Sequence, residues 1–192
     1  MRTCAQVNRH RYGLTLRCAC RKKQKDFRAG PSTSRLKKFA EAGPLSEPHI
    51  LVEGDVIGEI HVPRLGLNVI VVQGDSAASL RRAVGHISKS ALPGKWGNVA
   101  LAGHRDTLFR PLRDIRVGDE IDFTTPERGF EYIVESIQVV APNEVQVLEP
   151  STGHDLTLVT CFPFYFVGPA PKRFVVRAHE VAGTLHGQLA KE

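Results

Sequence analysis

Short runs rich in Val and Ile, separated by Gly, Pro, Asn and Asp, recur along the chain from residue 54 onward. Runs of this kind between turn residues predict β-strands, and many of them at short spacing predict an all-β sandwich or barrel. A membrane-spanning helix needs about 18 or more consecutive apolar residues, and no such stretch is present in the sequence. The sequence therefore predicts a β-rich body without a visible membrane anchor.

The predicted body contains about eight strands. Pro126 and Gly129 predict a hairpin between two of them, because the proline stands where no ladder donor is needed. Apolar residues at helical spacing predict a short helix over 76–84, with Ser76 as its cap, and a second helical turn over 107–115. The predicted strands are 56–62, 67–72, 85–87, 98–103, 120–124, 130–140, 155–161 and 173–181.

Residues 1–53 differ from the body in charge and composition. Of the 26 Lys/Arg and 20 Asp/Glu of this 192-residue chain, residues 1–50 hold 12 and 3, which leaves 14 and 17 for residues 51–192. The segment also contains Gly-Pro breakers, so we predict a basic arm with little regular structure over 1–53 and one catalytic domain over 54–192. Such an arm suits contact with anionic lipid headgroups or nucleic acid, or is a solvated disordered tail.

The four cysteines fall as Cys4, Cys18 and Cys20 in the arm and Cys161 alone in the body. A disulfide within the body is therefore excluded. One residue separates Cys18 from Cys20, whereas zinc sites commonly have two or more between paired cysteines, and no second pair follows at a usable distance. We expect no metal site and no cofactor.

Cys161 ends a predicted strand. The residues before it alternate polar and apolar side chains, and Phe162-Pro163 follows, where the proline cannot continue a ladder. A cysteine at a strand terminus is accessible to substrate, whereas one inside a strand is usually a small core residue. Taken alone, Cys161 is better interpreted as a core residue.

His104 stands at a second strand end. An apolar strand ends at Gly103 and is followed by His104, Arg105 and Asp106. Histidine is the usual proton-transfer partner of cysteine, because its pKa of about 6.5 lets it donate or accept near neutrality. On its own, His104 would be a surface residue. The other body histidines that invite a catalytic or metal assignment, His86 and His154, are expected to be structural or exposed.

Arg173 begins the strand that follows Cys161, after a connection of eleven residues. Consecutive strands commonly pair, so the end of one strand and the start of the next are expected to lie side by side. A fixed guanidinium in a partly desolvated site stabilises the negative charge that acyl transfer develops on a carbonyl oxygen. Arg173 is therefore the candidate for this role, and Arg177 is the alternative.

Together these motifs resemble the sortase family. The resemblance rests on Thr-Leu-x-Thr-Cys at Thr157–Cys161, on the arginine of 173–176 and on the histidine of 101–107, in the family's order and spacing. The segment 57–67 is similar to the first sortase strand, and the resemblance covers about 54–181. The region from 157 to 178 looks most like class D and class E sortases.

The resemblance implies a closed eight-stranded β-barrel and transpeptidation without a cofactor. The enzyme would cleave a Leu-Pro-x-Thr-Gly-like sorting signal at Thr-Gly through a thioester. It would then join the Thr carbonyl to an amino nucleophile, from a cell-envelope lipid precursor or a pilin lysine, at the extracytoplasmic face of the membrane. The residues implied are Cys161, His104 and Arg173 for catalysis and Thr160, Thr157 and Ala102 for substrate contact.

Rival interpretations remain open at this point. A cysteine protease or isopeptidase would resolve the same thioester with water instead of an amine. A non-catalytic β-barrel could bind peptides or, through the basic arm, nucleic acid, although the mildly acidic body disfavours nucleic acid and we expect none as a partner.

Overall fold

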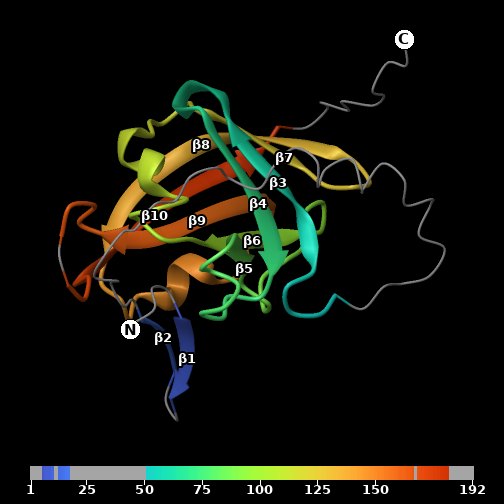
Figure 1. The fold of residues 1–192 in the computed structure, drawn as a ribbon. Helices are drawn as coiled ribbons and strands as arrows, with labels where there is room; N and C mark the ends of the chain where they lie inside the picture. The colour runs from blue at the N-terminus through green and yellow to red at the C-terminus, as the bar shows by residue number, and fades with distance from the viewer. Residues whose placement is uncertain (1–5, 11–12, 18–50, 167, 182–192) are drawn as a thin grey trace.

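The computed structural model describes residues 6–10, 13–17, 51–166 and 168–181. Residues 51–181 form a closed barrel of eight strands in the order β10-β8-β7-β3-β4-β5-β6-β9 (Figure 1). The predicted eight-stranded barrel is confirmed. Its strands are β3 (Val56–Val62), β4 (Leu67–Gln73), β5 (Val84–His86), β6 (Gly97–Ala102), β7 (Glu120–Thr124), β8 (Gly129–Val140), β9 (His154–Phe162) and β10 (Lys172–Glu180).

Two of the neighbouring strand pairs are parallel. β4 pairs with β5 and β6 pairs with β9 in parallel, whereas the other pairs are antiparallel, including the predicted β7–β8 hairpin and the β9–β10 pair. The carboxyl ends of parallel neighbours lie at the same rim of a sheet. The end of β6, the end of β9 and the start of β10 therefore meet at one rim of the barrel.

Alternation along the strands divides the side chains between the barrel interior and its outer face. On β9, Leu156 and Leu158 belong to the main core, together with Leu101 of β6 and Val176 of β10. Burying a Leu or Ile side chain contributes roughly 1.5–3 kcal/mol, so this interior dominates the stability of the barrel. The intervening residues point outward, and Val159 packs there against neighbouring strands and the turn η4 (Val145–Leu148).

The predicted helix over 76–84 is wrong. Leu80 N–H donates to the Ser76 carbonyl and Ala83 N–H to the Ser79 carbonyl, but Arg82 N–H also donates to Ser79, so the segment forms turns. This short connection returns the chain to β5 beside β4 and buries Leu80. Ser76 does act as a cap, since its Oγ accepts from Ser79 N–H at 3.3 Å.

The described residues contain three short 3₁₀ turns and no α-helix. The predicted helical turn over 107–115 is present as η3 (Arg110–Asp114), and the other two turns are η2 (Pro63–Leu65) and η4. The expected one or two short helices are thus replaced by these turns.

A small hairpin lies within the first fifty residues. β1 (Gln6–His10) pairs with β2 (Gly13–Arg17) in an antiparallel register, although the sequence predicts little regular structure there. Residues 18–50, which include most of the predicted arm, lie outside the described residues. The division of the chain at residue 53 stays a prediction.

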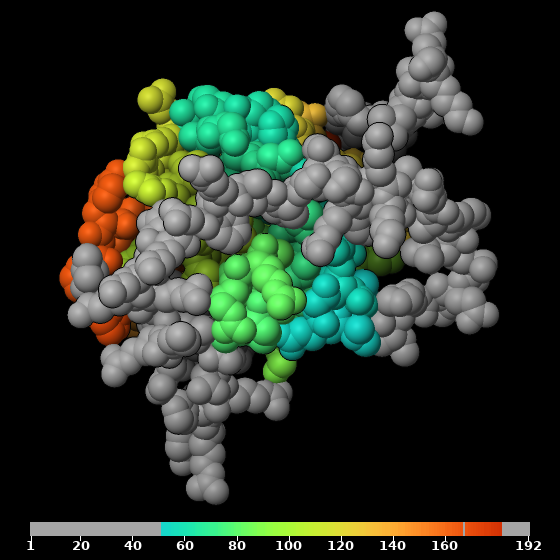
Figure 2. Space-filling view, in the orientation of Figure 1, coloured from blue at the N-terminus to red at the C-terminus, as the bar shows by residue number. Residues whose placement is uncertain are grey.

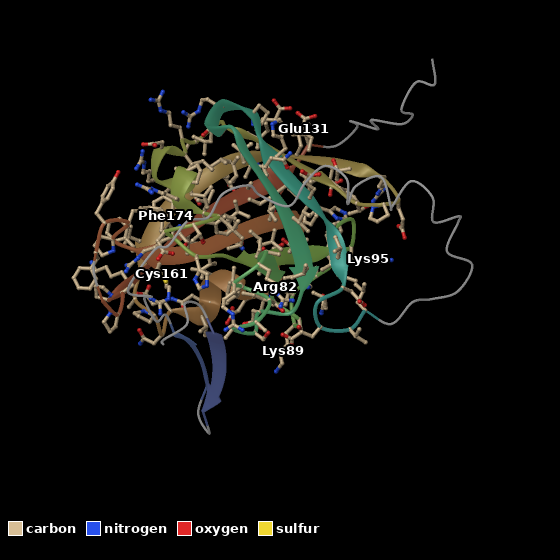
Figure 3. The ribbon with its side chains drawn as sticks, viewed as in Figure 1. Arg82, Lys89, Lys95, Glu131, Cys161 and Phe174 are labelled. Atoms are coloured by element: carbon tan, nitrogen blue, oxygen red, sulfur yellow. The ribbon has the colours of Figure 1, made fainter. Side chains whose placement is uncertain are left out.

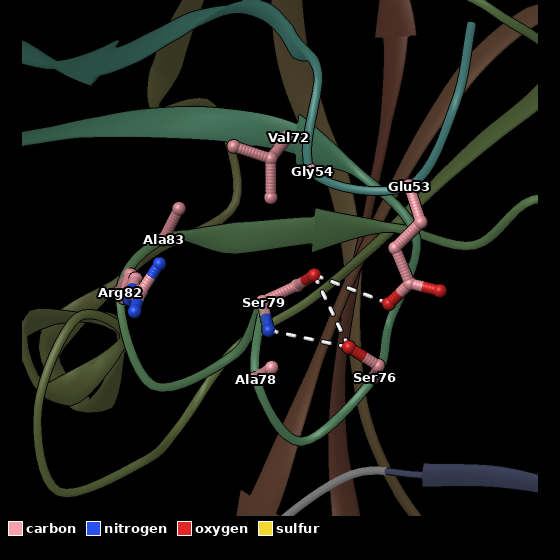
Figure 4. A pocket seen from close by; sticks show the side chains of 8 residues that line it. All are labelled: Glu53, Gly54, Val72, Ser76, Ala78, Ser79, Arg82 and Ala83. Atoms are coloured by element: carbon pink, nitrogen blue, oxygen red, sulfur yellow. Dashed lines mark hydrogen bonds between the residues drawn. The ribbon is translucent and has the colours of Figure 1, made fainter.

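A pocket of about 320 Å³ opens between the start of the body and the β4–β5 connection (Figure 4). Inside it, Ser79 Oγ donates to Glu53 Oε1 at 3.2 Å and lies 3.2 Å from Ser76 Oγ. None of the residues predicted for catalysis or substrate contact lines this pocket. Its lining residues are Glu53, Gly54, Val72, Ser76, Ala78, Ser79, Arg82 and Ala83.

Candidate active site

Cys161 and Arg173 lie directly opposite each other in the antiparallel β9–β10 pair. Directly opposed residues of an antiparallel pair project to the same face with Cβ atoms about 4.5–5.5 Å apart. The predicted pairing of these two strands is therefore confirmed. Figure 3 shows Cys161 and Phe174 at one end of the barrel, far from Lys95 and Glu131 at the other.

Cys161 is fully buried and packs against Ala170. The sequence predicts that Cys161 is the last residue of its strand. In the structure β9 continues to Phe162, so Cys161 is the penultimate residue. The cysteine is disulfide-bonded in the structure. Only a thiolate is nucleophilic, so this bond must be reduced before Cys161 can react.

His104 is carried to the same rim by the parallel β6–β9 pair. The register matches Ala102 with Val159, and Gly103 N–H extends it by donating to the Val159 carbonyl at 3.2 Å. Two further residues along each strand lead to His104 and Cys161, so the two side chains start from the same level. His104 itself is half-buried.

The turn after β6 is fixed by close packing at Gly103. A Cβ added there would lie 2.6 Å from Cδ2 of Phe109, whose ring is fully buried. Phe109 N–H donates to the His104 carbonyl at 2.9 Å and closes the turn. Any larger residue at position 103 would displace this ring, and His104 with it.

Arg173 is almost completely buried. Its Nη1 donates to the carbonyls of Lys172 at 2.8 Å and Ala170 at 3.2 Å. Burial, and secondly the positive charge of Arg105, lowers the pKa of Arg173 to about 10. The guanidinium therefore stays protonated at neutral pH, in surroundings where its charge is poorly screened.

Arg177, the alternative, has different surroundings. It lies opposite Thr157 in the ladder, four positions from Arg173, and its Nη2 is 3.9 Å from Asp155 Oδ2. Both side chains of this ion pair are partly exposed. Register and pairing thus favour Arg173 as the arginine that faces Cys161.

Two of the predicted substrate-contacting residues are threonines on β9, and they face opposite ways. Thr157 shares the outer face with Cys161 and donates from Oγ1 to Asn98 Oδ1 at 2.8 Å. Thr160 points to the other face and donates to the Gly103 carbonyl at 2.8 Å. Both hydroxyls therefore tie β9 to β6, and the hydrogen bond of Thr160 holds the residue before His104.

Ala102, the third predicted contact, lies on the outer face of β6. It packs in a buried cluster with Leu80, Ile87 and Ala100, and Leu148 of η4 lies against this cluster. Contact of Ala102, Thr157 or Thr160 with a substrate stays a prediction.

Sequence reasoning missed Arg105. Its side chain is almost fully buried, and its guanidinium donates to the carbonyls of Pro163, Phe166 and Gly168 at 2.8, 2.7 and 3.2 Å. From the sequence, an arginine beside a histidine in a polar loop is predicted to be exposed to solvent. Its burial follows only from the folding of the β9–β10 connection around it.

His86 and His154, the two further histidines that invited a catalytic or metal assignment, make contacts with residues other than Cys161. The ring of His86 is buried, with Nδ1 2.9 Å from Gln73 Oε1 and Nε2 2.9 Å from the Ala91 carbonyl, and burial lowers its pKa. His154, at the start of β9, is partly exposed and packs edge-on against Trp96. Their expected structural roles agree with these contacts.

Neither a metal-binding cluster nor a membrane-spanning helix is found among the described residues. No group of three or more His, Cys, Asp or Glu side chains there has an arrangement that could hold a metal ion. No helix within the same residues is long and apolar enough to cross a membrane.

Comparison with known families gives a match to the model of the sortase domain over residues 60–181. The chain belongs to the sortase family. Sortases are cysteine transpeptidases of the cell envelope that process sorting signals, and this chain is an enzyme of that kind. The alternative of a non-catalytic binding barrel is not favoured.

Individual relatives agree with the class D and class E resemblance. Sortase D of Bacillus subtilis is 29% identical over 164 residues, which cover 85% of this sortase and 79% of that protein. The structure of the Clostridium perfringens Sortase D5 transpeptidase superimposes with a TM-score of 0.63 at 29% identity and covers 79% of this chain and 89% of its own. A sortase E mutant of Streptomyces avermitilis gives 0.60 at 31%, covering 68% and 91%.

Proposed function

We propose that this sortase cleaves a Leu-Pro-x-Thr-Gly-like sorting signal between Thr and Gly and joins the Thr carbonyl to an amine. In this proposal Cys161 is the nucleophile, His104 transfers protons and Arg173 stabilises the oxyanion. The observation that carries the proposal is the register that sets Cys161 opposite a buried, charged arginine at the rim where the His104 strand ends.

Acylation begins with the reduced Cys161 thiolate. Its sulfur attacks the Thr carbonyl carbon, and the carbonyl oxygen takes the electron pair and becomes an oxyanion. Arg173 donates to this oxygen, in a site where burial keeps its charge unscreened. As the oxyanion collapses, the Thr-Gly bond breaks, His104 gives a proton to the leaving Gly amine, and the Thr acyl group remains on sulfur as a thioester.

Deacylation follows the same path in reverse with a different amine. The incoming amine attacks the thioester carbonyl, His104 accepts its proton, and the thiolate leaves as the new amide forms. We propose an amine from a cell-envelope lipid precursor or a pilin lysine as the acceptor. Water in place of the amine would give hydrolysis by the same three residues.

We also propose that the enzyme works at the extracytoplasmic face of the membrane. The excess of Lys/Arg in residues 1–50 supports contact with anionic headgroups, which attract clustered positive charge within about 8 Å at physiological salt. Co-sedimentation of the full chain with vesicles that contain phosphatidylglycerol, but not with neutral phosphatidylcholine vesicles, is the expected result. Equal binding to both would contradict this role of the charge.

The catalytic proposal is tested on the full chain in the presence of a phosphine reductant. The enzyme is incubated with a Leu-Pro-x-Thr-Gly peptide, with and without triglycine or an Nα-blocked lysine, and mass spectrometry follows the thioester, the cleaved peptide and the ligated product. Cys161→Ala is the matched control. We expect a protein adduct equal to the acyl fragment and ligation in the presence of amine, both lost in Cys161→Ala.

Each alternative has a distinct outcome in this experiment. Cleavage with water as the acceptor at every amine concentration would favour a hydrolase over a transpeptidase. Absence of any adduct across a panel of sorting-motif variants, with the protein folded and reduced, would overturn the proposed catalytic function.

A further inference from the structure

The segment that joins Cys161 to Arg173 is held from the side by a third residue, Arg105. This connection, residues 163–171, follows β9 and precedes β10. The Arg105 guanidinium uses Nη1 for the Pro163 carbonyl and Nη2 for the Phe166 and Gly168 carbonyls. A planar fork with several donors is suited to hold several acceptors in one fixed geometry.

The burial of Arg105 shows that this contact is built into the fold. Only 1% of the residue is exposed. A buried charge is costly unless its donors are satisfied, and backbone carbonyls cannot be protonated or rotated away without moving the chain. The guanidinium lies 5.9 Å from the centre of the Phe166 ring, a further contact to the same connection. Arg105 and this connection therefore move as one unit.

Arg105 and the connection that it holds are linked to all three proposed catalytic residues, either by a few covalent bonds along the chain or by a hydrogen bond. Arg105 directly follows His104, and its acceptor Pro163 is two residues after Cys161. Gly168 is two residues before Ala170, whose carbonyl accepts from Arg173 Nη1 at 3.2 Å. The effect of the Arg105 charge on the pKa of Arg173 is in keeping with two nearby guanidinium groups.

We propose that Arg105 is a positioning residue for the sortase reaction. By holding the carbonyls of Pro163, Phe166 and Gly168, it fixes the connection so that the Arg173 guanidinium stays aimed at the face of Cys161. The inference rests on the proposed roles of Cys161 and Arg173. Loss of Arg105 would let the connection shift, and displacement of a catalytic group by about 1 Å can cost on the order of 10²-fold in rate.

Arg113 offers a matched control. It reaches the same connection, since its Nη1 donates to the Tyr165 hydroxyl and its guanidinium lies 5.6 Å from that ring. Figure 2 shows the segments near residues 110 and 165 adjoining at the surface. Unlike Arg105, Arg113 is partly exposed and binds a side chain, so its removal leaves the backbone of the connection held.

The experiment compares Arg105→Met, Arg105→Lys and Arg113→Met in the reduced full chain, with kcat and KM measured for thioester formation. We expect kcat to fall about 10²-fold in Arg105→Met, with KM changed less than about threefold, and a smaller loss in Arg105→Lys, which keeps the charge but not the fork. Arg113→Met should stay within about threefold of the unsubstituted enzyme. Thermal melting checks that each variant is folded.

A double-mutant cycle separates positioning from a general structural effect. In the Arg173→Ala background, Arg105→Met should lower kcat by less than about threefold, because the group it positions is already absent. Full additivity of the two losses, or a loss confined to KM, would overturn the inference. If Arg105→Met does not fold, the cycle is run with Arg105→Lys. Failure of the unsubstituted enzyme to form any thioester would instead refute the proposed function on which this inference rests.

Discussion

The β9–β10 ladder carries two arginines in contrasting surroundings. Arg173 faces Cys161 and is buried, with hydrogen bonds to backbone carbonyls. Arg177 faces Thr157 and lies partly exposed beside Asp155. An exposed ion pair is screened by water and contributes about 0–1 kcal/mol, whereas a buried guanidinium held by the fold acts strongly on any charge that forms beside it. The ladder thus places Arg173 in a buried site suited to chemistry and Arg177 at a position that is partly exposed to solvent.

The largest expected effect concerns the sulfur of Cys161, the residue that faces Arg173. Because Cys161 is disulfide-bonded in the structure, we expect the full chain purified under oxidising conditions to show no thioester formation and to gain activity on addition of a phosphine. Titration of free thiols before and after reduction, together with turnover, measures this. Full activity of the oxidised, unsubstituted chain would show that Cys161 is free in solution.

Substitution of His104 and of His154, two half-buried histidines, extends the comparison. His104→Gln should lower kcat about 10³-fold, in line with loss of a general acid and base, and remove the neutral limb of the pH–rate profile. His154→Gln, at the other end of β9 beside Trp96, should leave both unchanged within about threefold. Stopped-flow acylation across pH 5–9 tests this. A pH profile that survives in His104→Gln would assign proton transfer to another group.

The two arginines themselves give the next smaller effect. Arg173→Ala should lower kcat about 10²-fold with little change in KM, as expected for a donor that acts on the oxyanion. Arg177→Ala removes only a partly exposed pair with Asp155 and should change kcat less than about threefold. Steady-state ligation kinetics give kcat and KM for both variants and so test this difference. Equal losses in the two would mean that burial and register do not mark the functional arginine.

The strands of the barrel and the pairing of Cys161 with Arg173 could be predicted from the sequence. Alternating apolar residues set the strands, and the likelihood that consecutive strands pair brought Cys161 and Arg173 together, as the register confirms. The turns at 77–83 could not be predicted, because local apolar spacing favours a helix, whereas the backbone hydrogen bonds to Ser76 and Ser79 mix three- and four-residue spacing and form turns. Likewise the burial of Arg105 depends on carbonyls 58 to 63 residues further along the chain.

Burial alone does not mark a functional group, and His86 provides the test with the smallest effect. Its ring is buried and hydrogen-bonded between Gln73 and Ala91, and burial lowers its pKa. A depressed histidine pKa adds stability that is complete above its ordinary value of 6.5 and is lost as pH falls, because the unfolded chain then binds the extra proton.

Thermal melting between pH 7.5 and pH 5 should therefore show a smaller acid-induced loss of Tm in His86→Gln than in the unsubstituted chain. Kinetics in His86→Gln should be near normal wherever the variant is folded, since no proposed catalytic step uses this ring. His154→Gln, whose side chain is partly exposed, should retain the slope of the unsubstituted chain. An unchanged slope in His86→Gln would place the acid sensitivity in other groups and would remove the stability role assigned to this buried histidine.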